Sequence, residues 1–193
     1  MQVESGDVRK SIKLTENLTE MAPSSRLEAP SVSGMTNTTY DYFSHKLHTY
    51  HAANGLTIDE DVHVYAYSFY LINDSAESLE VKSTLYYSNV TKNLDKGMRV
   101  MTLSSKEDVA SFNVIGCYQA HDDEEASDPY GSTYPAVTEF LDNDRVYEER
   151  FLSFDPNSHL KYTLLFWIEG KDPDTTDDLW NGTIRFTLKL SIL

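Results

Sequence analysis

Two acidic segments carry side chains whose types and spacing suit metal binding. Residues 172–178 read Asp-Pro-Asp-Thr-Thr-Asp-Asp, and hard oxygen ligands on a turn-forming backbone are what calcium prefers. The segment lacks the glycine at position six and the glutamate at position twelve of an EF-hand loop. The sequence therefore predicts a non-EF calcium site formed by Asp172, Asp174, Asp177 and Asp178. Capping of a short turn or helix by the Asp and Thr residues of this segment is the alternative, and it is the favoured one.

The second acidic segment, residues 121–128, is a weaker calcium candidate, and a solvated loop is the alternative interpretation of it.

Three histidines, His45, His48 and His51, are spaced by three residues. If this region is helical, two of these histidines share one face and could bind a transition metal together with a carboxylate. A tyrosine- and histidine-rich surface segment whose spacing is chance is the favoured interpretation.

Recognisable enzyme motifs are absent from the sequence. It contains no GxSxG, GxxxxGK[ST], GxGxxG or HExxH pattern, which are the arrangements that position a nucleophile, a phosphate, a dinucleotide or zinc. Cys117 lies in the apolar run FNVIGCY, which predicts a buried small side chain rather than a reactive thiolate. We therefore expect no catalytic residues, no cofactor other than the calcium considered above, and no enzymatic activity.

The composition restricts the partners. The 193 residues include 16 basic and 31 acidic side chains, for a formal charge of −15, which repels phosphate backbones and disfavours nucleic acid as a partner. A single cysteine excludes an internal disulfide framework. No stretch approaches the roughly 20 apolar residues of a membrane-spanning helix. The partners left open by the composition are other copies of the chain (self-association) and other proteins.

Short alternating segments dominate from residue 61 onward. Residues 61–73 place valine and aromatic residues on both parities, which is typical of a strand covered on both faces. Residues 182–193 alternate cleanly between apolar and polar side chains. Further strands are expected at 79–87, 98–103, 112–118, 144–154 and 160–169. This spacing predicts an all-β antiparallel sandwich or barrel with long loops and one or two short helices.

The first 60 residues are expected to form a separate N-terminal segment beside a β-sandwich domain at 61–193. One short strand is predicted around Val8–Leu14, because its apolar residues alternate. Residues 20–40 are rich in Ser, Thr, Pro and Gly and predict a long loop. Tyr42, Phe43, Leu47 and Tyr50 fit one face of a short helix that ends at Gly55. The segment could pack on the sandwich or exchange with that of another copy.

The C-terminal block Lys161–Leu190 carries a family resemblance. It contains Trp167, Ile168, Glu169, Gly170, Asp172, Pro173, Asp177, Asp178 and Gly182 in a strand, acidic turn and final alternating strand. This block resembles exported proteins of Gram-positive bacteria, of the SipW-dependent TasA and camelysin type. Residues 66–103, which begin Ala-Tyr-Ser-Phe-Tyr-Leu-Ile-Asn, resemble a second block of these proteins.

The resemblance implies an extracellular or cell-envelope protein with a jelly-roll-like β-sandwich. TasA-type members form fibres in which one subunit adds a strand to the sheet of the next, and the segment Val8–Leu14 is the donor strand we expect here. The resemblance also implies that Trp167 plugs the end of the sandwich while Glu169 and Gly170 shape the next turn. The function expected is a non-catalytic matrix or fibre subunit. A surface adhesin or ligand-binding module and a camelysin-like metalloprotease are the alternatives.

Overall fold

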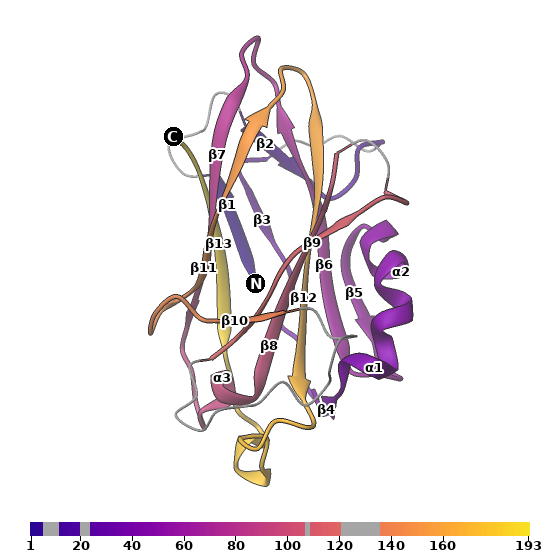
Figure 1. Ribbon diagram of the computed structural model, residues 1–193, viewed down its shortest axis with the longest axis vertical. Helices are drawn as coiled ribbons and strands as arrows, with labels where there is room; N and C mark the ends of the chain where they lie inside the picture. The colour runs from indigo at the N-terminus through magenta and orange to yellow at the C-terminus, as the bar shows by residue number, and fades with distance from the viewer. Residues whose placement is uncertain (6–11, 20–23, 107–108, 121–135) are drawn as a thin grey trace.

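Two β-sheets face each other in the computed structural model, which describes residues 1–5, 12–19, 24–106, 109–120 and 136–193 (Figure 1). Sheet A contains, in spatial order, β11 (Arg145–Phe154), β7 (Leu79–Ser88), β13 (Arg185–Ile192), β1 (Gln2–Ser5) and β3 (Arg26–Glu28). Sheet B contains β10 (Val137–Glu139), β9 (Asn113–Gln119), β8 (Met98–Ser105), β12 (His159–Glu169), β6 (Val64–Asn73) and β2 (Ile12–Thr15). The predicted all-β sandwich is confirmed.

The long strands pair antiparallel, as predicted, but three short strands pair parallel. β1 runs parallel to β13, β10 runs parallel to β9, and β4 (Asn37–Thr38) runs parallel to β12. β5 (Gly55–Asp59) adds antiparallel to β6 beside β2. The strands β1, β3, β4 and β5 were not predicted, because segments of two to five residues are too short to show alternation.

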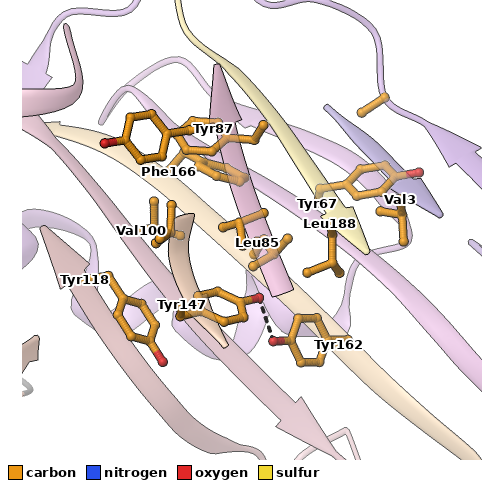
Figure 2. Packing of buried hydrophobic residues seen from close by; sticks show 14 of the residues in the cluster. Val3, Tyr67, Leu85, Tyr87, Val100, Tyr118, Tyr147, Tyr162, Phe166 and Leu188 are labelled. Carbon is orange, nitrogen blue, oxygen red and sulfur yellow. Dashed lines mark hydrogen bonds between the residues drawn. The ribbon is translucent and has the colours of Figure 1, made fainter. Parts of the chain in front are cut away.

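The main core lies between the two sheets. Val3, Leu85 and Leu188 of sheet A and Tyr67 and Val100 of sheet B are almost wholly buried there (Figure 2). Their positions follow from strand periodicity, because alternate side chains of a strand point to the same face. Burial of these aromatic and aliphatic groups is the principal stabilising term of the fold.

A second core covers the outer face of sheet B, so this sheet is buried on both faces, as the composition of 61–73 predicted. The covering layer is formed by α1 (Tyr40–Phe43), the 3-10 turn η1 (Ser44–Lys46) and α2 (Leu47–Ala52), which lie outside β5 and β6 (Figure 1). Phe43 and Tyr50 are buried as expected, whereas Tyr42 is exposed and contradicts the expected apolar face.

Trp167 belongs to this second core. Its ring is fully buried and meets Phe43 edge-on, with the ring centroids 5.1 Å apart. The position that the resemblance implies for Trp167 is therefore wrong. Trp167 packs beneath the helices and does not fill the space between the two sheets. The physical reason is parity, because Phe166 and Ile168 take the inward positions of β12. Cys117 lies in the same outer core and is fully buried, as predicted.

The N-terminal segment contributes to both sheets. The expected strand Val8–Leu14 corresponds to β2, which starts at Ile12; residues 8–11 lie outside the described residues. Ile12 and Leu14 are buried against the main core, and β2 pairs with β6. The described residues of the segment 1–60 are thus folded onto the sandwich in this chain.

Candidate functional site

A cleft of about 530 Å³ opens between the two sheets where Met1, β3 and β13 face β5, β6, β8 and β12. Its inner wall is mainly apolar and is formed by Leu56, Tyr65, Tyr67, Leu94, Met98, Phe166, Ile168 and Phe186. The rings of Phe166 and Phe186 lie 4.6 Å apart, centroid to centroid. Pockets that bind small molecules usually measure roughly 300 to 1,000 Å³ and have mostly apolar walls.

Two connecting segments line the cleft from outside the sheets. Residues 29–36 run from β3 in sheet A to β4 beside sheet B, and they contribute Val32 and Met35. The turn after η3 (Asp177–Leu179) contributes Trp180, whose side chain is 61% exposed. Gly182 closes this turn with a bond from its N–H to the Leu179 carbonyl. A Cβ at residue 182 would lie 2.9 Å from the same carbonyl oxygen, so only glycine fits without a shift.

A polar cluster lies between the sheets at the opposite side. The Glu149 carboxylate of β11 accepts hydrogen bonds from Tyr118 of β9 and, at 3.0 Å, from Tyr162 of β12. The Tyr162 hydroxyl also lies 2.8 Å from that of Tyr147 (Figure 2). Burial raises the pKa of Glu149, and the two tyrosine hydrogen bonds oppose this shift. Since these bonds satisfy the buried groups, the cluster has a sufficient structural explanation.

A buried lysine lies at the end of α2. The Lys161 ammonium donates to the Ala52 carbonyl, to Asn54 Oδ1 and to the Tyr70 hydroxyl at 3.1 to 3.2 Å. The lysine side chain is almost fully buried, and burial lowers its pKa to about 8. A cation that bonds the last carbonyls of a helix stabilises that helix end. Lys161 is therefore explained as the group that fixes α2 to sheet B.

The three histidines do not form a metal site. His45 and His48 are exposed, whereas His51 is fully buried between α2 and sheet B. Its Nδ1 lies 2.8 Å from the Thr163 hydroxyl and its Nε2 lies 2.9 Å from the Ser105 hydroxyl. Both ring nitrogens are thus occupied, and the spacing of three is explained by helix packing.

The four aspartates of the predicted calcium site lie in different environments, some buried and some exposed. Asp172 is buried and its Oδ2 lies 2.5 Å from Nη2 of the buried Arg99, while its Oδ1 accepts the Asp174 N–H at 2.8 Å. Asp177 and Asp178 are exposed in the first turn of η3. A guanidinium this close would repel a cation from the carboxylate of Asp172. The turn-capping alternative is the better description of this segment.

No group of three or more His, Cys, Asp and Glu side chains is placed to hold a metal ion in the part of the chain that the structure describes. The second acidic candidate, His121 to Asp128, lies outside the described residues.

Glu169 and Gly170 do shape the turn after β12. Glu169 accepts hydrogen bonds from the Trp167 indole and from the Lys171 N–H. The Gly170 N–H donates a hydrogen bond to the Thr38 carbonyl.

Calcium is expected to leave the thermal stability of the protein unchanged. The charge of the Asp172 carboxylate is already balanced by the Arg99 guanidinium. This carboxylate is therefore not available as the central ligand of a calcium ion at Asp172–Asp178. We expect the same melting temperature in 5 mM EDTA and in millimolar calcium, measured by circular dichroism at constant ionic strength, with magnesium as the matched control. A calcium-specific rise in melting temperature that is lost in Asp174→Asn would contradict this.

Sequence reasoning missed the cleft, the Glu149 cluster and the burial of Lys161. Only Lys161 left a readable signal: it shares the parity of Thr163, Leu165 and Trp167 in β12, so it stands on a face that is otherwise buried. The cleft depends on the separation of the two sheets and on the path of residues 29–36, which alternation does not encode.

No protein-family model matches this chain, and no curated protein matches it either. Within the described residues, no helix combines the length and the apolar character needed to cross a bilayer.

Proposed function

We propose that this protein is a non-catalytic structural protein of the Gram-positive cell surface or extracellular matrix, whose subunits associate by strand addition. The observation that carries the proposal is the position of β1. This strand lies in the interior of sheet A, between β13 and β3.

The pairing of β1 is suited to exchange between copies. Gln2 to Ser5 pair in parallel with Thr187 to Leu190, at the other end of the chain, so no hairpin ties the two strands together. Val3 is fully buried and supplies a side-chain anchor. A short strand held by main-chain hydrogen bonds and one apolar anchor can be replaced by the same strand of a neighbour at little cost.

The strand β2 extends the segment that would be donated. It lies at the edge of sheet B and buries Ile12 and Leu14 against the main core. Residues 1–15 therefore place one strand in each sheet. In the proposed assembly these residues leave their own sandwich and occupy the same positions in the next subunit, which preserves every contact and repeats along a fibre.

Two features of composition agree with this proposal. A single buried cysteine means that the fold needs no disulfide, which suits Gram-positive extracellular proteins. The formal charge of −15 keeps free subunits apart until a specific contact forms. The metalloprotease alternative has less support, because the described residues bring no three metal-binding side chains together.

A reversible disulfide between β1 and β13 tests the proposal. Glu4 and Lys189 are directly paired in register and neither side chain belongs to the buried core. Neighbouring strands lie roughly 4.8 Å apart, within the range of a disulfide. We expect the oxidised Glu4→Cys/Lys189→Cys monomer to remain monomeric by light scattering and electron microscopy, and to assemble once it is reduced.

The same variant reports which chain supplies β1 in an assembly. Oxidation of assembled material should give a covalent ladder on a non-reducing gel, because β1 then pairs with β13 of the next subunit. Glu4→Ser/Lys189→Ser, which cannot be cross-linked, is the matched control and should assemble in both conditions. Equal assembly of the oxidised and reduced cysteine variant, or no assembly of the unmodified chain, would refute strand addition through β1.

A further inference from the structure

We propose that the cleft between the sheets binds a single acyl chain of an amphiphilic molecule. This inference goes beyond strand addition, because it assigns a ligand to a cavity that the assembly does not use. It rests on the volume of about 530 Å³, on the apolar inner wall and on the position of the polar groups at the outer part of the cleft.

The inner wall is mainly apolar and offers contacts to a hydrocarbon, with Tyr65 and Tyr67 as its hydroxyl-bearing side chains. Met98, Ile168, Phe166 and Phe186 present only carbon, sulfur and ring surface to the cleft. The hydroxyl of Tyr67, which also lines the cleft, is already bonded to Glu16. A buried water requires two to four polar partners, whereas apolar cavities stay dry and take apolar ligands.

The charges around the cleft do not select the sign of the head group of an acyl chain. Arg185 and Glu28 both line it, and Arg185 donates a hydrogen bond to Gln2 Oε1 at 3.1 Å. Opposite charges at one opening cancel, so long-range attraction favours neither anions nor cations. Affinity must then come from the apolar wall, which is the reason we assign an acyl chain, with its polar head remaining near Arg185.

An acyl chain can enter the cleft between the two flanking segments without the unfolding of either sheet. Val32 and Met35 are only partly buried and lie in residues 29–36, which contain no helix or strand. Trp180 is largely exposed on the other segment. A ligand that enters between these segments would cover all three side chains with apolar surface, which adds to the binding energy.

The two tryptophans of the chain make this site measurable. Trp180 lines the cleft and is exposed, whereas Trp167 is fully buried beneath α1 and α2. Spin-labelled stearate quenches fluorescence only at short range. Titration with this probe should therefore quench the emission of Trp180 in a saturable, one-to-one manner and leave that of Trp167 unchanged. Trp180→Phe should abolish the quenching.

A pair of matched substitutions tests whether the cleft itself is the site. Val32→Tyr adds a ring inside the cleft, and we expect about tenfold weaker binding or more. Val114→Tyr makes the same change at an exposed position of β9, away from the cleft, and should bind as the unmodified chain does. Both changes lie outside the buried core, and circular dichroism checks that each variant folds.

A second titration uses phosphatidylcholine vesicles that are brominated on their acyl chains. It identifies the source of the bound acyl chain. Quenching by stearate alone supports a free fatty acid as the ligand, and quenching by both probes supports a chain drawn from a lipid. The proposal is overturned if neither probe quenches Trp180 saturably, or if Val32→Tyr and Val114→Tyr bind equally. The assay uses monomeric protein, so its failure leaves strand addition untouched.

Discussion

Asp172→Ala is expected to lower the free energy of unfolding by about 3 to 5 kcal/mol. The substitution leaves the Arg99 guanidinium buried without the carboxylate that lies 2.5 Å away. It also removes the acceptor of the Asp174 N–H, which orders the turn after β12. Urea denaturation followed by circular dichroism at pH 7 measures the change, with the slope of the transition checked for two-state behaviour.

The neighbouring Asp178 provides the control for this prediction. It is exposed in the first turn of η3, so Asp178→Ala should change the stability by about 0.5 kcal/mol or less. A double replacement, Arg99→Met with Asp172→Leu, removes both charges and should recover much of the loss, because no unpaired charge remains. Equal effects of Asp172→Ala and Asp178→Ala would show that the ion pair contributes nothing.

The contrast between Asp172 and Asp178 explains why the acidic segment could not be interpreted from sequence alone. Seven residues with four aspartates fit a calcium loop and a capped turn equally well. The choice depends on Arg99, which is 73 residues away in β8 and reaches Asp172 only when β8 pairs with β12. No local pattern reports that contact, so the sequence identified the polar turn but not its partner.

Strand periodicity predicted the long strands because both sheets bury one face or two. In β13, Phe186, Leu188 and Leu190 point into the main core, in the alternation expected for residues 182–193. The same reasoning failed for β1, whose four residues hold a single buried aliphatic side chain, Val3. The burial of β1 comes from pairing with β13 at the far end of the chain, which is a tertiary effect.

The helical layer was anticipated only in part for a similar reason. Phe43, Leu47 and Tyr50 lie on the face that packs on sheet B, in agreement with helical spacing. Tyr42 lies on the exposed face, because the chain turns through η1 and breaks the regular period. His51, one position beyond Tyr50, is also buried, and this could be recognised only once Thr163 and Ser105 were placed beside it.

The cleft and β1, the strand proposed to be exchanged, occupy one region of the molecule. Met1, which precedes β1, and Glu28, which ends β3, line the cleft. Arg185 and Phe186 of β13 also line it. In the proposed exchange, a β1 strand from a neighbour takes the same place, so the wall of the cleft is restored in every subunit. Binding of an acyl chain and strand addition are therefore compatible, and each is tested without the other.

Acidification from pH 6.5 to pH 4 is expected to destabilise the protein by about 2 to 3 kcal/mol through His51. Burial, with smaller effects of Lys161 and His48, lowers the pKa of His51 from 6.5 to about 4. Between these two values the unfolded chain binds a proton at this residue and the folded protein does not. The contribution of His51 to stability is thus complete above pH 6.5 and is lost as the pH falls toward 4.

His51→Gln isolates this effect from the titration of the carboxylates. Glutamine can still bond the hydroxyls of Thr163 and Ser105 but does not titrate, and all other ionisable groups are common to both proteins. We expect the free energies of unfolding, measured by urea denaturation between pH 7.5 and pH 4, to fall more steeply for the unmodified chain. Nuclear magnetic resonance of the imidazole protons should give His51 a pKa well below the ordinary histidine value of 6.5. Parallel stability curves for the two proteins would mean that the buried ring titrates normally and that its pocket opens before the fold is lost.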